Sequence, residues 1–337
     1  MVKLKDIAAR AGVSIMTVSK ALRDAKDIAP ATRVRLRKLA EEMNYVPDLS
    51  AQLMRSRKTK LFGLIISAAT NPIYARIMMA IEERAHELQY DLLFAHSLNQ
   101  PSREEACIRR FLLRRVDGLF IVPVYRLTPN AIAYEEIKRL KVPTVILGHR
   151  GLFCSSFPNI ETDDIAASYA VTKHLIDLGH KRIAYFTGPP VSPSAQERYE
   201  GYRRALREAG IEMDDHLVFN AGGTIEEGEK AALQMLNEHP KATAVQAVND
   251  LVAIGAADVL LNQGIRIPDD IAVAGFGNIL VSEYFRVPLT TVRQPKLRLG
   301  YAAMDLMQAL LDGEAGESKR LRAEIVVRAS TGAAIKQ

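Results

Sequence analysis

Residues 4–22 carry the pattern that most constrains the fold of this chain, two short helical stretches separated by one glycine. The first stretch repeats its apolar residues at spacings of one, three and four, as one face of a helix does. These residues are Ile7, Ala8 and Ala11. Gly12 permits the left-handed turn that ends the helix, and Ser14 is placed to cap a second helix on which Val18 and Leu22 face inward. The pattern predicts a helix-turn-helix.

A third helix completes the small bundle, and its surface is basic. It is expected to start near Pro30, which is tolerated in a first helical turn, and its inner stripe comprises Leu36, Leu39, Ala40 and Met43. Residues 1–60 contain 14 lysines and arginines against 6 acidic residues, whereas the remainder contains 31 against 33. Because the excess positive charge is confined to this unit, we expect it to bind DNA. A helical bundle without a nucleic-acid partner is the alternative.

The segment that follows is predicted to be a hinge. Pro47 breaks the third helix, and residues 49–55 suffice for about two helical turns, too few to be stable alone in water. We expect this segment to become helical only against DNA or against its copy in a dimer. A solvated linker is the alternative.

Several short runs of sequence resemble one bacterial family. They are Ile7–Ser14, Thr17–Ser19, Asn44–Pro47, Gly179–Ala184, Asn249–Asp250 and Pro288–Val292. On these runs the chain resembles, over essentially its whole length, the lactose-repressor (LacI/GalR) family of transcription regulators. The resemblance implies an all-α helix-turn-helix DNA-binding domain over residues 1–46, a hinge helix over 47–59, and an effector-binding and dimerisation core over 60–335.

The resemblance also implies which residues read DNA. They are Ile15, Met16, Thr17, Ser19, Lys20, Arg23, Ala51 and Met54. Lys20 would donate to guanine, Ile15 and Met16 would pack on thymine methyl groups, and the two hydroxyl side chains would contact phosphates. In the family an apolar hinge residue wedges into the central base step. Met54 stands at that position, where leucine is usual, and a small residue precedes it by three to let the hinge helices approach.

From Leu61 onward, short apolar runs alternate with segments of helical spacing. Strands are predicted at 61–66, 91–95, 118–122, 144–147, 182–186, 217–220, 244–248 and 271–274, and helices at 72–88, 103–114, 163–178, 195–209, 225–237 and 250–262. Repeated strand–helix units predict α/β architecture with doubly wound parallel sheets in two lobes. The resemblance implies the periplasmic-binding-protein type I fold, with lobes over about 60–158 plus 289–318 and about 159–287 plus 320–335. An effector would bind between them, beyond the carboxyl ends of the strands.

Motifs of other protein classes are absent from the sequence. Gly188 opens no phosphate-binding loop, and Leu280 stands where a dinucleotide fingerprint needs its third glycine. The histidines show no metal-binding spacing, and Cys107 and Cys154 are scattered, as is typical of a reduced cytoplasm. There is neither a signal peptide, which a free-standing periplasmic receptor would need, nor a run of about 18 apolar residues. We expect a cytoplasmic protein without enzymatic activity, cofactor, metal or membrane partner.

Residues that match the family's effector contacts can be named one by one. They are Asn71, Ile73, Tyr74, Tyr125, Ser194, Arg198, Asn249 and Asp250. Gly148 and Gly277 stand where many sugar-binding relatives carry aspartate, and Gly223 stands where several carry an aromatic residue. Either the effector is bulkier and fills this space, or it meets the backbone there. His149 and Arg150 follow Gly148 and suggest an anionic ligand such as an acidic or phosphorylated sugar.

Together these features predict a sequence-specific transcription regulator, most readily a repressor, that binds a pseudo-palindromic operator as a homodimer. Its operator affinity would respond to a small molecule, a sugar or sugar derivative, with a purine or a partner protein as the alternative. Ile77, Met78 and Ile81 are expected at the dimer surface, with an internal core stripe as the alternative.

Overall fold

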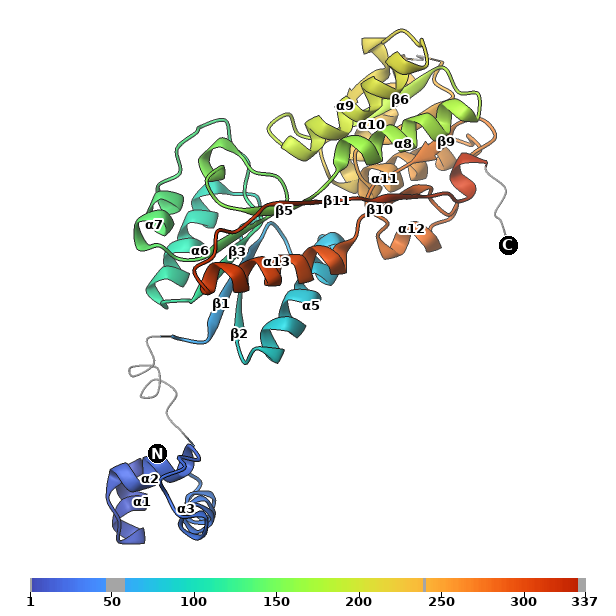
Figure 1. Ribbon diagram of the computed structural model, residues 1–337. Coiled ribbons are helices and arrows are strands. Elements are labelled where there is room, and N and C mark those ends of the chain that lie inside the picture. Colours follow the sequence, from blue (N-terminus) through green and yellow to red (C-terminus); the bar gives the residue numbers. More distant parts are fainter. Residues whose placement is uncertain (1, 47–57, 239–240, 333–337) are drawn as a thin grey trace. The chain divides into compact units, whose positions relative to one another are not determined.

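The computed structural model describes residues 2–46, 58–238 and 241–332, and the chain divides into two compact units, Met1–Thr59 and Lys60–Gln337. In the first unit the described helices are α1 (Leu4–Ala11), α2 (Ile15–Leu22) and α3 (Pro30–Glu42) (Figure 1). Gly12 adopts a φ of 69° at the end of α1, and Ser14 Oγ accepts from the backbone N–H of Thr17 at 3.0 Å to cap α2. The predicted helix-turn-helix is confirmed.

One side chain from each helix forms the centre of this small core. Ile7 of α1, Val18 of α2 and Leu36 of α3 are fully buried. Each comes from the apolar stripe that the sequence spacing identified, so the burial of these stripes accounts for the way the three helices pack.

The second unit contains two lobes (Figure 1). The first lobe is built on a parallel sheet with strand order β11-β5-β4-β3-β1-β2. Its strands are β1 (Leu61–Ile66), β2 (Asp91–His96), β3 (Gly118–Ile121), β4 (Thr144–Leu147), β5 (Asn159–Thr162) and β11 (Lys319–Leu321). Its helices are α5 (Pro72–Glu87), α6 (Pro101–Leu113), α7 (Ile132–Leu140) and α13 (Lys296–Leu311), with a short 3-10 turn at Leu152–Cys154.

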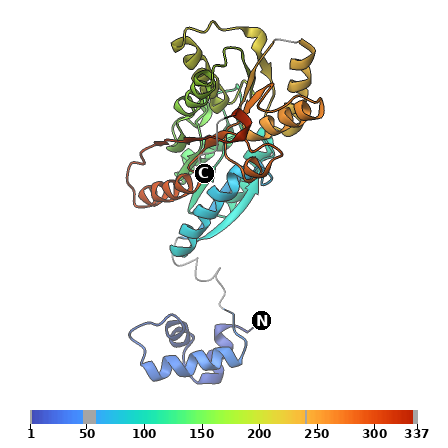
Figure 2. The same cartoon turned by 90° about the vertical axis from the view of Figure 1, so that its right-hand side faces the viewer.

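Strand β1 shows how the apolar runs of the sequence serve both faces of this sheet. Phe62 and Leu64 pack with residues of α5 and α13, whereas Ile65 packs with residues of α6 and α7. Successive side chains of a strand point to opposite faces, so a continuous apolar run is what a strand covered on both sides requires. Helices α5 and α13 lie side by side on one face (Figures 1 and 2).

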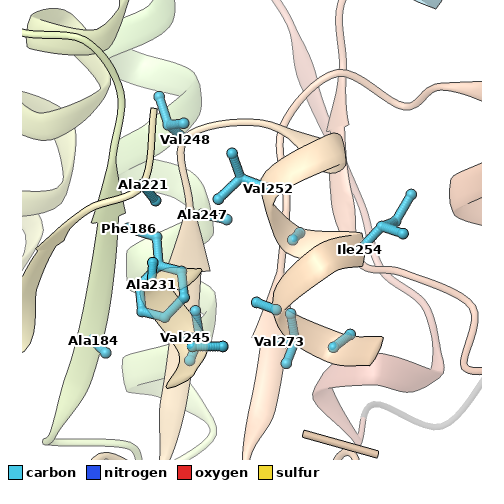
Figure 3. Packing of buried hydrophobic residues seen from close by; sticks show 14 of the residues in the cluster. Ala184, Phe186, Ala221, Ala231, Val245, Ala247, Val248, Val252, Ile254 and Val273 are labelled. Atoms are coloured by element: carbon cyan, nitrogen blue, oxygen red, sulfur yellow. The ribbon is translucent and has the colours of Figure 1, made fainter. Parts of the chain in front are cut away.

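The second lobe is built on a parallel sheet with strand order β7-β6-β8-β9. Its strands are β6 (Ile183–Thr187), β7 (Val218–Asn220), β8 (Ala244–Ala247) and β9 (Ala272–Ala274). Its helices are α8 (Asp164–Asp177), α9 (Pro193–Glu208), α10 (Ile225–Glu238), α11 (Asp250–Asn262) and α12 (Leu280–Tyr284), with 3-10 turns at Asp215–Leu217 and Ala329–Thr331. Figure 3 shows one of its apolar layers, in which Phe186 of β6 and Val245 of β8 pack with Val252 of α11.

The boundaries between the lobes differ from the predicted ones. Strand β5 pairs with β4 and β11, so residues 159–162 belong to the first lobe and the chain crosses to the second just before α8. Residues 290–293 belong with the second lobe, because Thr290 and Arg293 bridge to Ala274 and Gly277 beside β9, and β10 (Thr291–Arg293) pairs with β12 (Glu324–Val326). The prediction missed these short strands because polar residues interrupt their apolar pattern.

The predicted dimer stripe on α5 is wrong. Ile81 is fully buried and Ile77 nearly so, and both pack into the core beneath α5 together with the half-buried Met78. Their helical spacing therefore reflects the internal core stripe, which was the alternative interpretation. Met79, which the prediction omitted, is the large apolar residue of α5 that is exposed.

Candidate functional site

The outer face of α2 presents two apolar side chains to solvent. Ile15 is 52% exposed and Met16 is 55% exposed, although the small core of the unit lies directly behind them. Exposed large apolar residues on a helix-turn-helix recognition helix are suited to pack on thymine methyl groups in the major groove. Thr17 Oγ1 lies 2.8 Å from the capping Ser14 Oγ, at the end of the helix that would approach phosphates.

Basic side chains surround this face, and several have partners within the unit. Lys20 Nζ pairs with the carboxylate of the exposed Asp27, and the hydrogen bond from Lys20 lowers the pKa of Asp27. Arg23 Nε donates to the carbonyl of Ser19 at 3.0 Å. Because the Lys20–Asp27 pair is solvent-exposed, it is weak, and a DNA base or phosphate can replace the carboxylate. Ala51 and Met54, predicted for the hinge, lie outside the described residues.

In the second unit, polar side chains from both lobes meet near the carboxyl ends of the strands, some of them within β5 and β11. This inter-lobe cluster comprises Tyr125, His149, Glu161, Asp164, Glu197, Arg198 and Arg320. Tyr125 and His149 follow β3 and β4, and Tyr125 donates its hydroxyl to the carbonyl of His149 at 2.9 Å. Glu197 and Arg198 lie on the first turns of α9 in the second lobe.

Arg198 is the most constrained of the predicted effector residues. Nη1 donates to the carbonyl of Val248 at 2.7 Å, and Nη2 lies 3.2 Å from Asp164 Oδ2. The guanidinium stacks on the ring of Phe276, with Cζ 3.8 Å from the ring centre. Asp164 is almost fully buried, and burial raises its pKa although the charge of Arg198 opposes the shift. Among the described residues, three buried side-chain polar atoms have no hydrogen-bond partner: Arg198 Nε, Asp164 Oδ1 and the Tyr185 hydroxyl, of which the first two belong to this cluster.

Two predicted asparagines cap helices at this edge. Asn71 Oδ1 accepts from the backbone N–H of Ile73 at 3.1 Å at the start of α5. Asn249 Oδ1 accepts from Val252 N at 2.8 Å at the start of α11, while its Nδ2 donates to the carbonyl of Gly223 at 3.0 Å. Asn249 adjoins Val248, which accepts from Arg198, so the fold brings Asn249 and Arg198 together.

The other predicted effector residues have separate surroundings. Ile73 packs against the cores of both lobes, and the half-buried Tyr74 has a pKa raised by burial. Ser194 Oγ lies 2.9 Å from Ser192 Oγ at the start of α9. Asp250 is buried within the second lobe, where its carboxylate accepts from the hydroxyl of Thr291, from Ser282 Oγ at 2.7 Å and from the N–H of residue 279 at 2.9 Å. Three protein donors thus already occupy the Asp250 carboxylate.

Comparisons with known proteins identify the family in which the exposed face of α2 and the inter-lobe cluster occur together. The model of bacterial regulatory proteins of the lacI family matches residues 3–48, and that of a periplasmic binding protein-like domain matches residues 172–331. The HTH-type transcriptional repressor CytR of Escherichia coli (strain K12) is 31% identical over 332 residues, covering 98% of this chain and 96% of that protein. PurR of Vibrio atlanticus (strain LGP32), also an HTH-type transcriptional repressor, is 31% identical over 337 residues, covering 98% of both.

This chain belongs to the lacI family of bacterial regulatory proteins. Among solved structures, the regulator resembles a lac repressor dimer bound to operator and the anti-inducer ONPF, with 28% identity and a TM-score of 0.87 over 98% of this chain and 99% of that one. It also resembles a complex of the transcriptional regulator CelR with cellobiose, with 29% identity and a TM-score of 0.74 over 98% and 100%. The N-terminal unit of the regulator is therefore its DNA-binding domain.

The structure adds residues to the regulator's inter-lobe site that the sequence did not single out. Asp164 and Glu197 belong to it because of their pairing with Arg198 and His149. The buried Lys296 donates to the carbonyls of Gly277 and Asn278 at 2.6 and 2.8 Å, and burial lowers its pKa to about 8. Sequence spacing could not reveal these pairings, because the partners lie on different elements.

The two basic residues proposed to favour an anionic effector already have partners within the protein. Arg150 donates to the carbonyls of Ser155 and Phe157 in its own loop, and His149 pairs with Glu197. Gly148 has a φ of 100° and Gly277 a φ of 137°, conformations that favour glycine over side chains such as aspartate. The backbone conformation therefore explains why glycine, and not aspartate, stands at these two positions.

Two further expectations concern metals and membranes. The parts of the chain that the structure describes contain no group of three or more His, Cys, Asp or Glu side chains placed to hold a metal ion. Within the same residues, no helix combines the length and apolar character that crossing a membrane requires.

Proposed function

We propose that this regulator is a transcription repressor whose operator affinity is set by a neutral, hydroxyl-bearing small molecule, a sugar or sugar derivative, bound between the lobes. The observation that carries the effector class is the pair of buried polar atoms without partners, Arg198 Nε and Asp164 Oδ1. One is a donor and the other an acceptor, and a hydroxyl can satisfy either. Buried polar atoms are costly unless hydrogen-bonded, so a ligand that supplies both bonds gains affinity from them.

The charges of the inter-lobe cluster support a neutral ligand over an anionic one. Three carboxylates, those of Glu161, Asp164 and Glu197, face three basic side chains, His149, Arg198 and Arg320, each of which is already paired with a carboxylate. Lys296, which also belongs to the site, donates to two backbone carbonyls. An anion would meet no uncommitted cation among these side chains and would be repelled by the carboxylates. A neutral sugar therefore suits these charges better than the acidic or phosphorylated sugar suggested by the sequence.

Operator recognition in this proposal uses two copies of the chain. A two-fold dimer presents two equivalent α2 helices to a pseudo-palindromic operator. The structurally similar lac repressor is a dimer bound to its operator. A ligand that binds one relative arrangement of the lobes more tightly shifts the regulator toward that arrangement, by no more than its difference in affinity for the two. The proposal includes no catalytic step and no cofactor.

A thermal-shift screen of the purified protein against neutral sugars, nucleosides, purines, sugar acids and sugar phosphates tests the effector class. We expect a neutral hydroxylated compound to raise the melting temperature and to change operator affinity in a fluorescence anisotropy titration. Asp27→Asn, in the DNA-binding unit, is the matched control and should keep the ligand-induced thermal shift. Stabilisation by sugar acids or phosphates alone would contradict the proposal, and stabilisation by a free purine base would favour the alternative class.

A further inference from the structure

Glu197 of the second lobe is held by two basic side chains of the first. Its Oε2 lies 2.9 Å from His149 Nε2, and its Oε1 accepts from Arg320 Nη2 at 2.8 Å. Arg320 also pairs with Glu161 at 2.7 Å, and Asn159 Nδ2 donates to the second oxygen of Glu161 at 2.8 Å. We call His149, Glu161, Glu197 and Arg320 the inter-lobe bridge, because they join β4, β5 and β11 of the first lobe to α9 of the second.

The bridge differs from the many surface ion pairs of this chain in its burial. The side chains of His149, Glu161 and Glu197 are 7%, 14% and 20% exposed, whereas that of Arg320, at 43%, is as exposed as the side chains of the surface pairs. Exposed pairs such as Lys138–Glu135 contribute little because water and salt screen them, whereas partly buried pairs are screened less. A change in the charge of one member of the bridge therefore alters how strongly the lobes are held in this arrangement.

His149 is the member of the bridge whose charge changes near neutral pH. It faces Glu197 on α9, Glu161 on β5 at 4.0 Å and Asp164 at the start of α8, with Arg320 beyond Glu197 and the Tyr125 hydroxyl on its carbonyl. Burial alone lowers the pKa of His149, but the hydrogen bond to Glu197 and the three carboxylates outweigh it, so the pKa lies above its ordinary value of 6.5.

The direction of the pH effect follows from this raised pKa. Reorientation of the lobes would separate His149 from Glu197 and return its pKa toward the ordinary value. The bridge therefore stabilises the present arrangement of the lobes fully at pH values below the ordinary pKa of histidine. This stabilisation is lost as the pH rises through the raised pKa of His149. Acidification thus favours the bridged arrangement of the lobes.

We propose that the inter-lobe bridge is a proton-sensitive device that biases the lobes toward the bridged arrangement, so that operator affinity depends on pH even without an effector. Only the operator part of this inference rests on the proposed function. Residues 1–59 contain no histidine, so no imidazole in the DNA-binding unit can supply the same pH dependence.

Operator affinity of the full chain, measured without effector at about pH 6 and about pH 8, tests the device. We expect the wild type to change by roughly threefold or more, since a pKa that differs by one between two arrangements corresponds to about a tenfold change in their equilibrium. His149→Gln keeps a hydrogen-bond donor but does not titrate, and Glu197→Gln removes the charge that His149 meets. Both should lose most of the pH dependence, whereas Glu135→Gln, which alters an exposed ion pair that contains no histidine, should keep it.

Thermal unfolding over the same pH range gives a second readout that needs no DNA. Glu197→Gln should lower the melting temperature more at the lower pH than at the higher, and Glu135→Gln should show no such difference. An unchanged pH dependence of operator binding in both bridge variants would overturn the inference, as would equal melting shifts at the two pH values. If no variant binds an operator, the proposed function fails, while the melting shifts still decide whether the bridge is proton-sensitive.

Discussion

Replacing Arg198 with methionine tests how the inter-lobe site is held together. The substitution removes the guanidinium from Asp164, whose side chain is 1% exposed, and from the face of the Phe276 ring. Breaking a buried ion pair by removing one partner costs about 3–5 kcal/mol, because the remaining charge is left without a partner in a dry environment. Arg198 is itself only 13% exposed, so solvent screening reduces this cost little.

We therefore expect Arg198→Met to lower the free energy of unfolding of the second unit by about 3 kcal/mol at neutral pH. Asp164 can protonate when its partner is gone, and burial already raises its pKa, which limits the loss. Because the pKa of Asp164 is raised in the folded protein, protonation of Asp164 stabilises the folded protein at low pH. This stabilisation is lost as the pH rises through the raised pKa. The defect should accordingly be smaller at about pH 5 than at about pH 7.

A double-mutant cycle measured by urea denaturation separates this pairing from general damage to the site. Asp164→Asn removes the stranded charge, so the double variant should be more stable than the sum of the two single losses predicts, by about 1 kcal/mol or more. Additive losses with no dependence on pH would refute the reasoning. Arg198 would then act through its packing on Phe276 and its hydrogen bond to the carbonyl of Val248, and not through Asp164.

Four further outcomes are expected. Lys20→Ala should relax discrimination at one operator base pair by about 1–3 kcal/mol, measured by binding to operators altered one position at a time. Met54→Gly should weaken operator binding far more than binding to unrelated DNA, and equal losses would count against a base-step wedge. Ile81→Ala should cost about 2–5 kcal/mol of stability in denaturant unfolding while leaving dimerisation, followed by sedimentation, unchanged. Gly255→Ala should destabilise the second lobe by about 1–3 kcal/mol, because its Cβ would lie 2.1 Å from the carbonyl oxygen of Ile225.

The DNA-binding unit was predictable from sequence because its determinants are local. A glycine with positive φ, a serine cap three residues from its partner N–H and apolar residues three or four apart are all features of one short segment. The eight predicted core strands likewise match strands β1–β4 and β6–β9 to within one residue at every end, since continuous apolar runs are what sheets covered on both faces require.

The inter-lobe site was only partly predictable. The family resemblance identified Arg198 and Asn249, which the fold brings together through Val248. It did not reveal that Asp164 pairs with Arg198, or that His149 and Arg320 both pair with Glu197. The partners in these three pairs lie 34, 48 and 123 positions apart in the chain.

By itself, the sequence determined the helix-turn-helix, the alternation of strands and helices, and the family of the regulator, because each depends on short-range spacing or on motifs. Only the tertiary structure decided that Ile77 and Ile81 face the core, that β5 belongs to the first lobe, and that His149 and Arg150 already have hydrogen-bond partners within the protein. Helical spacing identifies an apolar face but not what covers it, and strand pairing and charge pairing depend on which distant segments the fold brings within a few ångströms.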